Sequence, residues 1–365
     1  MDVVNLLRTD VLASTFAESP LPPGTTAPRK DNSFAPGFLY TPASTERHIL
    51  EHAVQLGWAA APRAGKTSTV WEDATATTEQ VYSDLHAFRK ELDDYNVRLK
   101  DFKPVQDVRV QMDQTSQEQV CRSLELHEDG LPGIFASGQL SLTSTSGYVE
   151  PLLPPLRHPD FCKKDRKVRI RAVMDLSYLV HDFGAMCRRL KRHSRIVLVD
   201  MGASLEFHIK DQTTPAVYLT ELYRKFGLPF DHIYAFEVTP TLPEKVYQKL
   251  PEHLMAAYHW INVGVSADPS SRLSPLKLLL ENFNEDDLIV IKLDIDTSSS
   301  EVLLAMQLLQ DDRYSNLIDQ FYFEHHVKNK EMGGYWGASM RGSFKDSLDL
   351  FAGLRNKGIP AHSWI

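Results

Sequence analysis

The chain has 365 residues, of which 42% are hydrophobic and 24% are charged, and its formal net charge is −8. This composition is ordinary for a soluble protein, and the length is enough to bury a core and suggests two domains. No apolar run approaches the roughly 18 residues that a transmembrane helix needs, so we expect no membrane span. The N-terminus lacks the basic region and apolar stretch of a secretory signal.

Positive charge is concentrated in one segment of this acidic chain. Residues 163–195 contain eleven Lys or Arg against three Asp, a local charge of +8. Such a segment can attract an anionic partner. A solvated face around the apolar residues of a helix accounts for the same pattern and is the interpretation we favour, so a nucleic-acid partner is not expected.

The three cysteines are Cys121, Cys162 and Cys187. They are too few and too scattered to predict a disulfide framework or a Cys-x-x-Cys metal site. A reducing compartment is the simplest inference, and we therefore expect a cytoplasmic protein.

The first half of the chain predicts a tail followed by helices. Residues 1–45 are rich in Pro, Ser, Thr and Gly and are expected to be disordered. In residues 81–102, apolar side chains recur at alternating spacings of four and three, which predicts an amphipathic helix. This helix either packs on its own domain or pairs with a second chain in a homodimer. Further helices are expected at 116–127 and 172–192, so residues 46–194 form a mainly helical N-terminal module.

From residue 195 to the C-terminus, strand patterns alternate with helix patterns. This order predicts an α/β domain at 195–365, with a Rossmann-like, doubly wound, mostly parallel sheet. We expect strands at 195–200, 232–238, 258–266, 287–296, 319–327 and 359–364, with helices near 215–226, 243–256, 274–283, 299–311 and 343–357.

Ligands bind beyond the carboxyl ends of the strands in such sheets. The polar residues that should meet there are Asp200, Glu237, Ser266, Asp294, Asp296, Glu324 and His326. Gly202 allows a tight turn after the first strand, and Glu237 could accept hydrogen bonds from both hydroxyls of a ribose. A pyrophosphate turn needs Gly-x-Gly-x-x-Gly, whereas Leu205-Glu206-Phe207 follow Ser204, which makes NAD and FAD poor candidates.

Four stretches resemble the class I S-adenosylmethionine-dependent methyltransferases, and more specifically their FkbM-like family: VDMGAS, AFEVTP, NVGVS and IKLDIDTSSSEVLLAMQLL. The resemblance covers residues 195–327. It implies a class I methyltransferase-like fold that binds S-adenosylmethionine and transfers its methyl group to a hydroxyl of a small molecule or sugar. The implied cofactor residues are Asp200, Gly202, Ala203 and Ser204 at the methionine end, Glu237 at the ribose, and Ser266 with Asp268 near the adenine, and Asp294 would lie beneath the transferred methyl.

The stretch FYFEHHV carries a second group of candidate residues. On a strand, Glu324 and His326 lie on one face. With Asp294 and Asp296 nearby, they could ligate a divalent metal ion, or they could form only a hydrogen-bonded pair. Imidazole titrates nearest neutral pH, so His326 is also a candidate general base. The catalytic candidates are therefore Asp294, Asp296 and His326.

The segment EMGGYWGASMRGS (331–343) is rich in Gly and aromatic residues. It predicts either a flexible lid with Tyr335, Trp336 and Arg341 in contact with substrate, or a plain surface loop. Three hypotheses follow for the whole chain: a methyltransferase-like enzyme, a non-catalytic binding or scaffold protein with a degenerate methyltransferase fold, and a metal-dependent enzyme built on Asp294, Asp296, Glu324 and His326.

Overall fold

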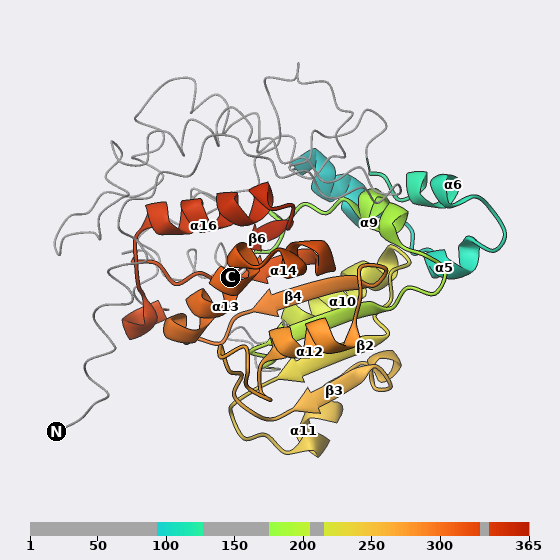
Figure 1. Ribbon diagram of the computed structural model, residues 1–365. Helices are drawn as coiled ribbons and strands as arrows, with labels where there is room; N and C mark the ends of the chain where they lie inside the picture. Colours follow the sequence, from blue (N-terminus) through green and yellow to red (C-terminus); the bar gives the residue numbers. More distant parts are fainter. Residues whose placement is uncertain (1–92, 127–174, 205–214, 329–335, 365) are drawn as a thin grey trace, which may run out of the picture. The chain divides into compact units, whose positions relative to one another are not determined.

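The computed structural model describes residues 93–126, 175–204, 215–328 and 336–364. At its centre lies a six-stranded sheet with the order β3-β2-β1-β4-β5-β6 (Figure 1). Every neighbouring pair of strands is parallel. The predicted α/β class and parallel sheet are therefore confirmed. The strands are β1 Ile196–Met201, β2 His232–Phe236, β3 Tyr258–Ile261, β4 Leu288–Leu293, β5 Ile318–Phe323 and β6 Ala361–Ser363.

Apart from Asp200 in β1 and Lys292 in β4, the two central strands are apolar, because both faces of the sheet are covered. All six residues of β1 and all six of β4 are buried. Successive side chains of β1 enter different cores: Ile196 and Leu198 belong to one hydrophobic cluster, whereas Val197 and Val199 belong to the other. The result is a three-layer arrangement with the sheet in the middle.

Each hydrophobic cluster contains its own set of helices. The first layer consists of residues 93–101, α5 Val108–Gln111, α6 Gln117–Arg122, α9 Phe183–Arg189, α10 Pro215–Lys225 and α11 Pro243–Tyr247. The second layer consists of α12 Pro275–Asn282, α13 Ser298–Gln310, α14 Asp312–Leu317 and α16 Phe344–Asn356. Two short 3-10 turns, η3 Glu252–Leu254 and η4 Gly337–Ser339, lie between helices and strands.

Three helices differ from the sequence-based expectation. The helix predicted at 172–192 is shorter, because the Asp182 carboxylate caps α9 by accepting a hydrogen bond from the Ala185 amide at 2.7 Å. The helix predicted at 243–256 is divided into α11 and η3 by Pro251, which has no amide to donate. Asp311 starts the unpredicted α14 directly after α13.

The end of the predicted 81–102 helix packs against its own chain. Tyr95 is buried in the first hydrophobic cluster, and Leu99 and Phe102 pack against the same cluster. The ring of Phe102 stacks on Phe226, with centroids 4.1 Å apart. For these residues the structure favours intramolecular packing over a homodimer contact. Residues 81–92 lie outside the described part of the chain.

The residues on both sides of the predicted boundary at 195 share one core. Side chains of α6 and α9 lie in the same cluster as those of β1 and α10, and every described residue belongs to one compact unit, Phe34–Ile365. The predicted tail at 1–45 falls outside the described residues. Among those that are described, no helix combines the length and apolar character required to cross a bilayer.

A disulfide joins Cys121 of α6 to Cys187 of α9, with their Cα atoms 5.3 Å apart. The expectation that the cysteines are too scattered to pair was wrong for these two, because the adjacent helices bring together residues 66 apart in sequence. Disulfides persist mainly in oxidising environments. The cysteine pattern therefore no longer supports a reducing compartment. Cys162 lies outside the described residues.

Reduction of this disulfide is expected to lower the free energy of unfolding by about 4 kcal/mol, because the bond closes a long loop in the unfolded chain. Urea unfolding with and without reductant measures the effect. In a Cys121→Ala/Cys187→Ala variant, the reductant should change nothing. An equal response of the native chain and this variant would show that the bond does not form.

Candidate functional site

A tight turn after β1 is held by close packing of backbone on backbone. Gly202 has a φ of +86°, and a Cβ at this position would lie 1.5 Å from the carbonyl oxygen of Asp294. The amides of Gly202 and Ala203 both donate to the carbonyl oxygen of Phe236 at 2.9 Å. Because both amides already donate to Phe236, neither can donate a hydrogen bond to a bound phosphate.

A buried lysine of β4 links the ends of β1 and β4. The Lys292 ammonium lies 3.0 Å from Asp200 Oδ1, 3.0 Å from the carbonyl oxygen of Gly202 and 3.3 Å from Asp294 Oδ2. Burial alone would lower the pKa of Lys292, but the attraction of Asp200 and Asp294 outweighs it and raises this pKa. Lys292 therefore remains a cation beneath the turn.

Asp200 has one carboxylate oxygen in use and one without a partner. Its side chain is fully buried, and Oδ1 is bound to Lys292. Oδ2 makes no hydrogen bond within the described part of the chain. Buried polar atoms are nearly always hydrogen-bonded, so this oxygen is a buried acceptor in need of a donor next to the β1 turn.

Glu237 directly follows β2, at the strand end where the sequence predicted it. One of its two carboxylate oxygens has a hydrogen-bond partner. Oε1 accepts a hydrogen bond from the Thr239 amide at 2.6 Å, while no partner of Oε2 is found among the described residues. The Asn262 side chain donates to the Glu237 carbonyl oxygen at 2.6 Å. The backbone that carries Glu237 is thus fixed, and one carboxylate oxygen remains free to accept.

The predicted adenine residues form a local turn of their own. β3 ends at Ile261, so Ser266 lies in irregular chain beyond the strand rather than at its end. Ser266 Oγ accepts from the Asp268 amide at 3.2 Å, and Asp268 Oδ1 accepts from the amide and the hydroxyl of Ser270, both at 2.8 Å. These contacts do not join Ser266 or Asp268 to Asp200 or Glu237. Ser204 is exposed at the end of the β1 turn.

A second polar cluster follows β5. His326 Nε2 lies 2.8 Å from Glu324 Oε2, and the Trp336 indole donates to Glu324 Oε1 at 2.7 Å. The Ser339 hydroxyl donates to the carbonyl oxygen of Trp336, so at 2.7 Å it accepts from His326 Nδ1. Both imidazole nitrogens therefore face acceptors. The hydrogen-bonded pair foreseen for Glu324 and His326 is present, and it favours the imidazolium form over a free general base.

Charges in this cluster shift one another's pKa values. Burial would raise the pKa of Glu324, but the hydrogen bond and charge of His326 lower it to about 2. Burial would lower the pKa of His326, yet Glu324 raises it. Burial also raises the pKa of Asp294 well above its ordinary range; the charge of Lys292 opposes this, whereas the hydrogen bond and charge of Glu324 add to it. The pKa values of Asp294 and Glu324 are therefore shifted in opposite directions, upward for Asp294 and downward for Glu324.

Asp296 and Glu301 border the second cluster. Asp296 has a φ of +54°, is 83% exposed, and places Oδ1 3.9 Å from His326 Nε2. Glu301, in the first turn of α13, is fully buried, and its Oε1 accepts from the Ile295 amide at 2.8 Å. Its Oε2 has no hydrogen bond among the described residues, and burial raises its pKa to about 7.

The residues predicted to contact substrate have other surroundings. Tyr335 lies outside the described part of the chain. Trp336 is buried, and its ring stacks on His326 with centroids 4.9 Å apart. Arg341 is exposed, but its guanidinium donates to the carbonyl oxygens of Ala338 and Met340, at 2.7 and 2.9 Å. Trp336 therefore fixes the position of Glu324, because its buried indole N–H needs an acceptor.

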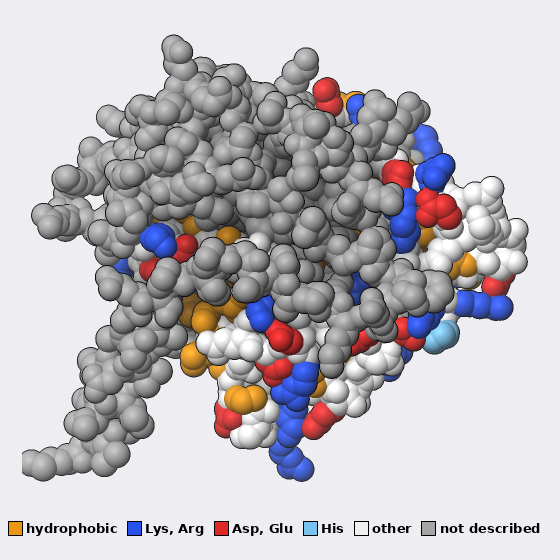
Figure 2. Space-filling model, turned by 45° about the horizontal axis from the view of Figure 1, so that its top comes forward, with side chains coloured by type: hydrophobic (Ala, Val, Ile, Leu, Met, Phe, Trp, Pro, Cys, Tyr) orange, Lys and Arg blue, Asp and Glu red, His pale blue; other side chains and the backbone are white. Residues whose placement is uncertain are grey.

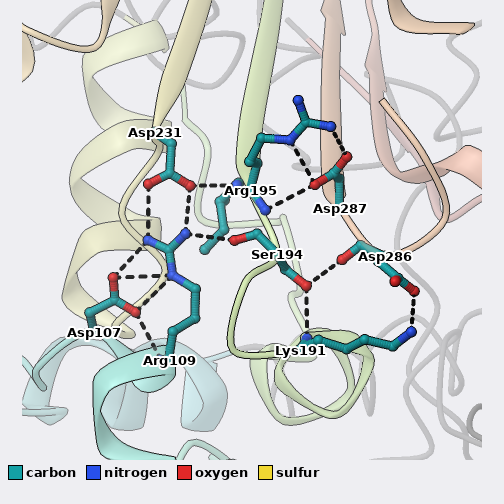
Figure 3. Close-up of polar contacts among 9 residues, drawn as sticks. Asp107, Arg109, Lys191, Ser194, Arg195, Asp231, Asp286 and Asp287 are labelled. Atoms are coloured by element: carbon teal, nitrogen blue, oxygen red, sulfur yellow. Dashed lines mark hydrogen bonds and ion pairs between the residues drawn. The ribbon is translucent and has the colours of Figure 1, made fainter. Parts of the chain in front are cut away.

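A surface pocket lies at the opposite, amino-terminal edge of the sheet, lined in part by Arg109, Arg195 and Asp231. Figure 3 shows Arg109 held between Asp107 and Asp231, and Arg195 facing Asp287. Arg109 also donates to the Ser194 carbonyl oxygen at 2.8 Å. The guanidinium of Arg109 is therefore occupied by hydrogen-bond acceptors of the same chain. This network connects α5 to the starts of β1 and β2, and it leaves the charge of Arg109 neutralised rather than available to a ligand.

The basic segment at 163–195 is neutralised wherever the structure describes it. Its described Lys and Arg residues all lie in ion pairs: Arg188 with Glu118 and Glu125, Arg189 with Asp319, Lys191 with Asp286, Arg192 with Asp113, and Arg195 with Asp287. On the face shown in Figure 2, basic and acidic side chains of the described residues are interspersed. This pairing supports the interpretation of a solvated face.

The structure thus brings together two groups that the sequence analysis treated as one. Asp200, Lys292 and Asp294 form the first, and Asp294 connects it through Glu324 to the second. Lys292 and Glu301 were missing from the predicted site, although a lysine within the apolar run LIVIKL was a signal for the former. No known protein-family model matches the chain, and no curated protein and no solved structure was found to match it. The functional argument therefore depends on the geometry of the site.

Proposed function

We propose that this chain binds S-adenosylmethionine beyond the carboxyl ends of β1, β2 and β4 and transfers its methyl group to a hydroxyl of a small molecule or sugar. The strand order reverses between β1 and β4, and ligands of such sheets bind at the reversal point. The Gly202 turn and the Asp200–Lys292 pair both lie at this point.

One observation carries the proposal: the amide donors of the turn already have acceptors, whereas two nearby carboxylate oxygens have no donor among the described residues. The amides of Gly202 and Ala203 donate to Phe236. Among the described residues, neither Asp200 Oδ2 nor Glu237 Oε2 has a hydrogen-bond partner. Such a site suits a ligand that presents hydroxyl and ammonium donors and has no pyrophosphate. S-adenosylmethionine has a ribose diol, an ammonium group and no phosphate.

Each residue has a distinct part in this arrangement. The open Glu237 oxygen would accept hydrogen bonds from the ribose hydroxyls, and the Asp200 carboxylate, fixed by Lys292, would attract the ammonium group. The bound cofactor would supply an electrophilic methyl carbon on a positively charged sulfur. The chain would mainly align the acceptor hydroxyl with that carbon, which is the largest requirement of a direct displacement. Of the three catalytic candidates, Asp296 is the exposed one and is open to an acceptor.

Isothermal titration of the full-length protein with S-adenosylmethionine and S-adenosylhomocysteine tests the proposal. We expect both ligands to bind, and we expect Glu237→Gln to weaken binding by about tenfold or more, because each hydrogen bond to a charged group contributes about 1.5–3 kcal/mol. The matched control is Glu244→Gln, an exposed glutamate of α11, which should bind like the native chain.

Two results would contradict the proposal. One is the absence of heat at millimolar ligand from a protein whose circular dichroism shows it to be folded. The other is equal affinity for Glu237→Gln and the native chain, which would leave binding without the ribose contact.

A further inference from the structure

We propose that Asp296, Glu324 and His326 form a binding site for a divalent transition-metal ion at the end of β4 and β5. One ligand atom from each of the three residues lies within 4.8 Å of the other two. The site lies beside the Asp200–Lys292 pair and does not include it. Whether this site binds a metal ion therefore does not depend on whether S-adenosylmethionine binds.

The distances between the three ligand atoms suit one small cation. His326 Nε2 is 2.8 Å from Glu324 Oε2 and 3.9 Å from Asp296 Oδ1. Ligands about 2.0–2.2 Å from a metal ion lie about 3 Å apart when adjacent and about 4 Å apart when opposite. A cation between these atoms would replace the existing Glu324–His326 hydrogen bond with two metal–ligand bonds, and the Nε2 proton would leave to solvent.

A second observation concerns a buried carboxylate beside the three proposed ligands. The carboxylate of Glu301 is fully buried, and Oε2 has no hydrogen-bond partner in the described part of the chain. The charged groups around it are His326, Glu324 and Asp296, which are the proposed ligands. A buried carboxylate beside a cluster with two further carboxylates is costly unless a cation accompanies it. Glu301 would supply negative charge at the inner side of the ion.

The surroundings also resemble those of metal-bound histidines. The remaining nitrogen of His326 donates to Ser339, and the remaining oxygen of Glu324 accepts from Trp336. Such outer contacts fix the orientation of metal ligands. Asp296 is largely exposed, so the ion would keep open positions toward solvent, where a ligand oxygen could bind. A mixed set of one imidazole and carboxylates suits Mn²⁺ or Zn²⁺ better than Ca²⁺.

Titration of the full-length, chelator-treated protein with Mn²⁺, followed by electron paramagnetic resonance and calorimetry, tests the site. We expect one ion per chain in the absence of any cofactor. Asp296→Asn is the main variant, because Asn tolerates the same left-handed backbone and the side chain is exposed, so folding is retained. Its Mn²⁺ affinity should fall at least tenfold. Glu301→Gln should weaken binding about tenfold or more.

Asp349→Asn on α16 is the matched control and should bind Mn²⁺ like the native chain. Absence of Mn²⁺ and Zn²⁺ binding by the native protein would overturn the inference, as would an unchanged affinity in Asp296→Asn. Because the readout is the metal ion alone, these results are independent of whether S-adenosylmethionine binds.

Discussion

Replacement of Gly202 by alanine is expected to destabilise the chain by more than about 4 kcal/mol, an effect reserved for backbone clashes and similar severe defects. The left-handed conformation alone costs a residue with a Cβ about 1–2 kcal/mol. The added Cβ would in addition lie 1.5 Å from the carbonyl oxygen of Asp294, which is backbone and cannot turn away. The clash could be removed only if the β1 turn and the end of β4 moved apart. Thermal and urea unfolding measure the loss.

Gly358 provides the matched control for this substitution. Its φ is +85°, almost that of Gly202, but a Cβ there would meet nothing within 4 Å. Gly358→Ala therefore reports the conformational cost alone and should lose only about 1–2 kcal/mol. Equal stability of the two alanine variants would contradict the close contact between the β1 turn and the backbone of Asp294.

Replacement of Lys292 by methionine is expected to cost about 3–5 kcal/mol, the usual result of removing one partner of a buried ion pair. Methionine has a similar length, so the loss would come from charge rather than from a cavity. Asp200, fully buried, would then have neither oxygen bound to Lys292. Urea unfolding of the variant measures the difference in the free energy of unfolding.

Two further variants separate the ion pair from general effects of substitution. In Asp200→Asn/Lys292→Met both charges are absent, so this double variant should be more stable than Lys292→Met alone. Lys277→Met removes a partly exposed lysine that lies 3.8 Å from Glu281, and it should change stability by no more than about 1 kcal/mol. Additive losses in the double variant would contradict a coupled Asp200–Lys292 pair.

The parallel sheet was predictable because its strands have the composition that burial on both faces requires. IVLVDM and LIVIKL are nearly continuous apolar runs, and each is followed by a helix pattern. Helix ends were less predictable, since they depend on single side chains such as Asp182 and Asp311 that can cap a helix or sit within one. The Cys121–Cys187 disulfide was missed for a different reason: spacing in the sequence says nothing about which helices pack together.

The site was predictable in part. The apolar runs of the sequence show where the strands end, so the positions of Asp200, Glu237 and Asp294 at strand ends could be predicted. The role of Lys292 depended on which strands are neighbours: β4 lies next to β1, so a lysine of β4 can reach a carboxylate of β1. The contact of Trp336 could not be predicted either, because aromatic side chains among glycines do not show which acceptor an indole N–H reaches; here it donates to Glu324.

The central claim is that a nucleoside-type ligand binds at the carboxyl edge of the sheet, with its ribose at Glu237. The most direct test is a crystal structure of the protein with S-adenosylhomocysteine. The account predicts that the ribose hydroxyls lie within hydrogen-bond distance of Glu237 and that the ammonium group lies near Asp200, beside the Gly202 turn. A ligand seated instead in the pocket of Arg109 and Asp231, at the other edge of the sheet, would contradict it.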